Sequence, residues 1–129
     1  MVAFMIATTV PAVAVSKIAA AEMDEQFHEE REGLLRNAED MVAHGGMGDA
    51  QAIIHHCGEA ARYAESLINQ VSASHPDREE TVVPLNEVIR QCKRVSDIGG
   101  QADPGLLLNP AVKARAAARS AIRSLRGIQ

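Results

Sequence analysis

Residues 37–60 read NAEDMVAHGGMGDAQAIIHHCGEA. Two alanine-rich helical patterns meet in this stretch at a glycine-rich turn that is bracketed by histidines. Gly45 and Gly46 can adopt the left-handed backbone geometry that ends a helix, and the carboxylate of Asp49 can accept hydrogen bonds from the free amides that begin the next helix. The stretch therefore predicts a helical hairpin with candidate metal ligands near its bend.

Helical patterns continue on both sides of this hairpin. Apolar residues recur at helical spacing over Glu22–His44, which predicts the first helix. A stripe of small apolar residues in steps of three and four predicts a second helix that starts after Asp49 and ends at about Ser72. The third helix lies within 77–98. It begins near Pro76 or, because proline disrupts a helix interior, it begins or kinks at Pro84.

The second half of the chain repeats the pattern of the first. Gly99 and Gly100 end the third helix, and Asn109 followed by Pro110 predicts the start of a fourth helix that ends at Gly127. A helix ending in two glycines, a short turn and another alanine-rich helix thus occurs twice. We therefore predict an all-α fold, an antiparallel up-down-up-down four-helix bundle made of two helical hairpins.

Composition indicates a small helical domain and argues against several functions. The chain of 129 residues has no Trp, one Tyr and two Phe, so small aliphatic side chains must build the core. Its 13 basic and 17 acidic residues give a net charge of −4, which argues against a general affinity for nucleic acid. We find no catalytic triad-like arrangement, phosphate loop or Cys-x-x-Cys-His haem motif, and so expect neither an enzyme nor a nucleotide or haem protein.

The first 21 residues resemble an export signal. The run from Val2 to Val15 is apolar but, at about fourteen residues, shorter than a membrane-spanning helix. Small residues at 19–21 are typical of a signal-peptidase site, although no basic residue precedes the apolar run. We predict that 1–21 is a signal peptide or an apolar N-terminal segment, that 22–129 is the bundle domain, and that the protein is periplasmic or secreted.

His44 is the first candidate metal ligand. It follows Asp40 by four residues on one helix face, and Met47 and Asp49 lie in the turn beyond it. Imidazole and carboxylate ligands together suit copper, nickel or zinc. The alternative is that His44 only interacts with the last carbonyl groups of the helix and with its negative dipole end.

Three further histidines are candidates. His55 and His56 are adjacent, so their side chains point about 100° apart and cannot both face one site from a rigid helix. An ordinary solvated position explains either of them. His28 shares a helix face with Glu25 and Glu32 and could bind a metal ion with them. A di-iron centre would need a second Glu-x-x-His motif, which the chain lacks.

Cys57 and Cys92 both fall on predicted core stripes. If the third helix begins near Pro76, each cysteine lies about 24 Å along its helix from the turn, and a disulfide is within reach. If that helix begins at Pro84, Cys92 is only about 12 Å from the turn and the two sulfur atoms cannot meet. Unpaired, the cysteines would be small hydrophobic core residues or soft ligands for copper.

A ridge of arginines at steps of four lies on the predicted fourth helix and consists of Arg115, Arg119 and Arg123. Ion pairs with the acidic first helix, or simple solvation, would explain these residues without a ligand. Alternatively, the ridge binds an acidic protein partner.

Three segments carry a resemblance to a known family: AEDMVAHG at 38–45, GDA at 48–50 and HCGEAA at 56–61. They resemble the bacterial small metal-binding protein family, whose members are exported, histidine-rich four-helix bundles. The resemblance implies binding of divalent metals, copper prominently, with a role in metal handling or tolerance. His44 and His56 match histidines of the family's repeat. Histidine is absent from the other corresponding positions, which carry Tyr63 and, in the second hairpin, residues near Gln91, Ile98, Ala117 and Ser124.

We therefore expect a protein that binds a divalent transition metal, copper, nickel or zinc, at its first hairpin for storage, buffering or tolerance. The alternative is a metal-free helical-bundle interaction module whose arginine ridge binds an acidic protein partner.

Overall fold

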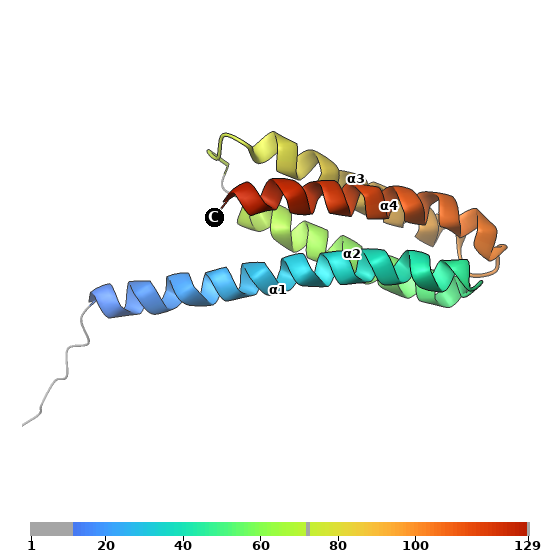
Figure 1. Ribbon diagram of the computed structural model, residues 1–129, viewed down its shortest axis with the longest axis horizontal. Coiled ribbons are helices and arrows are strands. Elements are labelled where there is room, and N and C mark those ends of the chain that lie inside the picture. The colour runs from blue at the N-terminus through green and yellow to red at the C-terminus, as the bar shows by residue number, and fades with distance from the viewer. Residues whose placement is uncertain (1–11, 72, 129) are drawn as a thin grey trace, which may run out of the picture.

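The computed structural model describes residues 12–71 and 73–128. Four α-helices account for most of this part of the chain, and a short 3₁₀ helix follows the last of them. Their bounds are α1 (Ala12–Gly46), α2 (Ala50–Gln70), α3 (Arg78–Ile98), α4 (Pro104–Leu125) and η1 (Arg126–Ile128). The helices pack side by side (Figure 1), which confirms the predicted all-α four-helix bundle.

Contacts between residue pairs show the relative direction of the first two helices. Glu30 of α1 accepts a hydrogen bond from Ser66 near the end of α2, whereas Gly45, at the end of α1, lies against Ile53 near the start of α2. These two helices therefore run in opposite directions. The turns of both hairpins lie at the same end of the bundle (Figure 1), where Gly100 lies against Gln51.

The core consists of small and medium-sized aliphatic side chains, as the composition predicts. Fully buried alanines occur on three of the four helices and are Ala38, Ala60, Ala64, Ala111, Ala114, Ala118 and Ala121. Such small residues let helix axes approach closely. Glycine allows a still closer approach between α1 and α2: a Cβ atom at Gly33 would lie 2.5 Å from Cζ of Tyr63, so the Tyr63 ring packs directly on the backbone of α1.

In the turn of the first hairpin, a different glycine from the predicted ones adopts the left-handed backbone conformation. Gly45 and Gly46 remain helical, and it is Gly48 that adopts a positive φ of 82°. Gly45 serves close packing instead, because a Cβ atom there would lie 2.7 Å from Leu108. The predicted role of Asp49 is confirmed, since its side chain caps α2 by accepting a hydrogen bond of 3.0 Å from the Ala52 amide.

α1 begins earlier than the sequence pattern predicts. It already includes residues 12–21, the second half of the predicted signal segment, since alanine-rich sequence such as residues 19–21 favours the helix. Residues 1–11 of that segment lie outside the described residues. None of the helices in the described ranges combines the length and the apolar character needed to cross a membrane.

α3 begins at Arg78, near Pro76, and continues through Pro84. Proline has no amide hydrogen, so the carbonyl group four residues earlier, that of Glu80, loses its usual helical partner. Ser124 of α4 donates to this carbonyl oxygen at 3.3 Å. A contact with a neighbouring helix therefore compensates for the proline.

The predicted start of the fourth helix at Pro110 is wrong. α4 begins at Pro104, and Asp103 caps it by accepting a hydrogen bond of 2.9 Å from the Gly105 amide. Leu107 and Pro110 are both buried. The longer helix thus adds apolar surface to the core that a later start would leave exposed.

Because α3 begins early, Cys57 and Cys92 lie at the same level, and they form a disulfide with a Cα–Cα distance of 5.2 Å. The bridge joins α2 to α3 and so links the two hairpins covalently. For its sequence separation of 35 residues, loop-closure entropy predicts a contribution of about 4 kcal/mol to stability.

Replacing Gly33 by alanine should destabilise the bundle. The added methyl group would collide with the Tyr63 ring, and overpacking of this kind costs about 1–3 kcal/mol. The matched control is Gly58→Ala, because nothing lies within 4 Å of its Cβ position and alanine is the better helix former by about 1 kcal/mol. Urea denaturation should give a lower free energy of unfolding for Gly33→Ala and a higher one for Gly58→Ala. Equal values for the two variants would contradict this packing.

Candidate functional site

Three histidine rings gather at the α1–α2 hairpin. His44, near the end of α1, stacks on His56 of α2, with ring centroids 5.3 Å apart and ring planes within 10° of parallel. His55 lies edge-on to His56, with centroids 5.2 Å apart. Adjacent side chains diverge by about 100° around a helix, yet the rings of His55 and His56 remain close. His56 is therefore the centre of the cluster.

Asn37 fixes which nitrogen of His56 carries the proton. The Nδ2 atom of Asn37 donates a hydrogen bond of 2.8 Å to the carbonyl oxygen of Gly33, so the amide oxygen Oδ1 faces the His56 ring. Since Oδ1 can only accept, His56 Nδ1, 2.9 Å away, must donate. In the neutral ring the lone pair then resides on Nε2, the nitrogen through which a metal ion can bind.

Burial favours the neutral form of His56. The pKa of its imidazole is lowered from 6.5, mainly because burial removes water that would solvate the cation. The carboxylates of Asp40 and Asp49 oppose this effect, whereas repulsion from His55 and His44 adds to it. At neutral pH the Nε2 lone pair therefore faces little competition from a proton.

The other candidate ligands of the hairpin have different surroundings. The Asp49 side chain is engaged in capping α2, and Asp40 is half-buried one turn before His44. Met47 lies in the turn and is 73% exposed. Over residues 12–71 and 73–128, no three His, Cys, Asp or Glu side chains are already arranged as a set that could hold a metal ion.

His28 does not belong to this cluster. It precedes His44 by 16 residues on α1, which places it about 24 Å away along the helix. It lines a separate surface cavity of about 490 Å³, together with Glu29, Glu32 and Tyr63. The predicted ligands are thus divided between the hairpin and a distant part of α1.

Glu39 organises the predicted arginine ridge. Its carboxylate accepts two hydrogen bonds from Arg119, of 2.6 and 2.8 Å, and lies 3.8 Å from Arg115. The hydrogen bond from Arg119 is also the main reason why the pKa of Glu39 is lowered. Ion pairs with α1 therefore account for Arg115 and Arg119, whereas Arg123 makes none with the described residues.

Two residues that matter here, Asn37 and Glu39, are not among the predicted candidates. Asn37 precedes His44 by seven residues, or two helical turns, and so shares its face. That spacing is a signal in the sequence that identifies Asn37 as a neighbour of the histidine. Glu39 pairs with a residue 80 positions later in the chain, for which no local signal exists.

Comparison with known proteins gives no match. No protein-family model fits the chain, and no curated protein or solved structure is significantly similar to it. The resemblance to small metal-binding proteins therefore rests on the sequence motifs alone, and a function has to be inferred from the geometry of the hairpin.

His56 should titrate below pH 6.5 in the folded protein. Because its pKa is lowered from 6.5, the folded state binds the proton less readily than the unfolded chain does. The stability that neutral His56 contributes is thus fully present above pH 6.5, and it is lost as the pH falls from 6.5 toward the folded-state pKa. An NMR titration of the imidazole resonances measures this midpoint.

The same titration on two variants shows whether the neighbouring histidine contributes to the lowered pKa of His56. His44→Gln removes a neighbouring positive charge and should raise the His56 midpoint, whereas His75→Gln, in the connection between α2 and α3, should leave it unchanged. A His56 midpoint at or above pH 6.5 in the wild-type protein would contradict the burial of the ring.

Proposed function

We propose that the α1–α2 hairpin binds a divalent transition metal ion, copper, nickel or zinc, through His44 and His56. The observation that supports this most is the hydrogen bond between Asn37 and His56, since it leaves the lone pair of His56 Nε2 available for a metal ion, beside a second imidazole. Metal-binding histidines are commonly held in this way by a polar group on their other nitrogen. Two imidazoles at the bend of a hairpin suit an exchangeable ion, so storage, buffering or tolerance is the role we infer.

The two rings are close enough for one ion to be shared after a change of side-chain conformation. Two imidazole nitrogens bound tetrahedrally to one metal ion at about 2.0 Å lie about 3.3 Å from each other. The ring centroids of His44 and His56 are 5.3 Å apart and the ring planes are within 10° of parallel, so a shared ion requires the His44 ring to turn about its side-chain bonds while Asn37 holds His56. Asp40, His55 and water are the nearest sources of further ligands.

We also propose that the protein works in an oxidising compartment, as a periplasmic or secreted protein. The Cys57–Cys92 disulfide supports this location, since such bridges persist outside the reducing cytosol. An export signal within residues 1–21 would account for delivery there. Metal buffering by this protein would then take place outside the cytosol.

Metal titration of the purified protein tests the site. We expect saturable binding of Cu²⁺, Ni²⁺ or Zn²⁺ in chelator competition, and loss of this binding in the His44→Ala, His56→Ala variant, which lacks both proposed ligands. The matched control is His28→Ala, His75→Ala, which removes two histidines away from the hairpin and should bind like the wild type. The proposal would be rejected if the wild-type protein bound none of these ions, or if the hairpin variant and the control variant lost metal affinity equally.

Asn37 provides a second test that leaves both ligands in place. Asn37→Leu removes the acceptor for His56 Nδ1, so the ring can change tautomer and metal affinity should fall by about 10–100-fold. Asn37→Asp keeps an acceptor at this position and should retain binding. Nitrogen chemical shifts of His56 report the tautomer directly. If Asn37→Leu changes neither the tautomer nor the affinity, Asn37 does not position the ring.

An interaction module without a metal is the second candidate. The observation in its favour is the positive charge at the end of α4, where Arg123 makes no ion pair within the described parts of the chain. Because Glu39 already binds Arg119 and lies near Arg115, an acidic partner would meet Arg123 and its neighbours rather than the whole ridge.

A further inference from the structure

His44 lies between two chemically different donor side chains at the end of α1. Asp40 precedes it by four residues and Met47 follows it by three. The Asp49 amide donates to the carbonyl oxygen of His44 at 3.2 Å, and Gly48 has the left-handed conformation. In this common closing pattern of a helix, the residue before the glycine, Met47, still follows the helical path. Residues three and four apart are neighbours on a helix surface, so Asp40 and Met47 flank His44.

The side chain of Met47 has room to move. It is 73% exposed, and glycines precede and follow it in the chain. No other part of the structure lies within 4 Å of the positions where Gly46 and Gly48 would carry a Cβ atom. Methionine is unbranched and flexible. Its Sδ atom can therefore reach the neighbouring His44 ring without displacing packed atoms.

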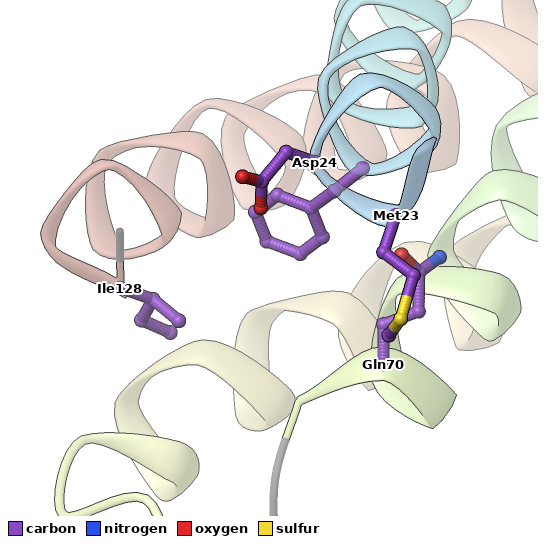
Figure 2. Close-up of a pocket in the computed structure, with 5 residues that line it drawn as sticks. Met23, Asp24, Gln70 and Ile128 are labelled. Atoms are coloured by element: carbon purple, nitrogen blue, oxygen red, sulfur yellow. The ribbon is translucent and has the colours of Figure 1, made fainter. Parts of the chain in front are cut away.

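Other soft sulfur donors in the described structure are bonded, buried or distant. Cys57 and Cys92 form the disulfide, and no cysteine in the described ranges is free. Met41 is fully buried in the core. Met23 precedes Met47 by 24 residues, or about 36 Å along the helix, and it lies beside the cavity shown in Figure 2. Over residues 12–71 and 73–128, Met47 is therefore the accessible soft donor at the hairpin.

The two donors beside His44 suit different metal ions. A carboxylate oxygen is a hard donor, whereas a thioether sulfur is soft and selects Cu⁺. Imidazole nitrogen is intermediate and suits copper, nickel and zinc. The two imidazoles with Asp40 thus form a ligand set for a divalent ion, and the same imidazoles with Met47 form a ligand set for Cu⁺.

We propose that the hairpin also binds Cu⁺, with the Sδ atom of Met47 as the third ligand beside His44 and His56. This inference rests on the metal-binding function proposed above and adds a second oxidation state of copper to it. In an oxidising compartment, thiols are consumed in disulfides such as Cys57–Cys92. A thioether forms no disulfide. Met47 therefore keeps a soft donor available at the hairpin in such a compartment.

Parallel affinity measurements for Cu⁺ and Zn²⁺ test the role of Met47. The whole purified chain is titrated against competing chelators, without oxygen and without thiol reductants, so that the disulfide stays closed. Met47→Leu conserves the size and apolar character of the side chain. Loss of a direct ligand should cost at least as much as loss of an outer-shell partner, so Cu⁺ affinity should fall about tenfold or more. Zn²⁺ affinity should stay unchanged.

Two further variants show whether the effect is selective. Asp40→Asn removes the hard, charged donor and should weaken Zn²⁺ binding more than Cu⁺ binding. The matched control is Met23→Leu, which removes the other exposed methionine and should bind both ions like the wild type. Circular dichroism should show every variant to be helical. X-ray absorption at the copper edge should detect a sulfur neighbour of Cu⁺ in the wild type and none in Met47→Leu.

The outcomes separate this inference from the proposed function. If Met47→Leu weakens neither ion or weakens both equally, or if the copper edge shows no sulfur neighbour, Met47 is not a Cu⁺ ligand and the inference is overturned. Binding of Zn²⁺ that depends on His44 and His56 would still support the proposed function in that case. If the wild-type protein binds none of Cu²⁺, Ni²⁺ and Zn²⁺, the proposed function fails and this inference fails with it.

Discussion

Close approach of helix backbones is the constraint on which this structure depends. With two Phe, one Tyr and no Trp, the chain has few large side chains with which to fill wide spaces between helices. The helices therefore meet through buried alanines, and Gly33 and Gly45 allow close contacts with Tyr63 and Ile53 of α2. Two such contacts, at well-separated points along one helix pair, fix the register of α1 against α2.

That register determines the chemistry of the hairpin. The residue that accepts the Tyr63 ring, Gly33, also supplies the carbonyl group that orients Asn37 one turn later. Asn37 in turn orients His56, which lies two turns before Tyr63 on α2. Packing and hydrogen bonding thus share one turn of α1 and two turns of α2, and a shift of the backbone at Gly33 would be transmitted directly to the imidazole.

Features that follow from local rules could be predicted from the sequence, and features that depend on distant partners could not. Asp49 caps the helix next to it, and the hairpin that this cap defines brings its histidines together. Pro84 is tolerated because of Ser124, and Pro110 because the fold buries its ring, so neither proline marks a helix start. The role of Asn37 has a sequence signal in its spacing, but its hydrogen bonds depend on side-chain conformations that only the packed hairpin defines.

Cys57 and Cys92 close a covalent loop that contains the last two-thirds of α2, the connection to α3 and the first two-thirds of α3. A peptide bond cut within that connection would leave two fragments, each with one helical hairpin, still joined through sulfur. The two fragments would migrate as one species in gel electrophoresis until the disulfide was reduced. In a compartment that contains proteases, the bridge therefore preserves the pairing of the two hairpins even after the chain between them is broken.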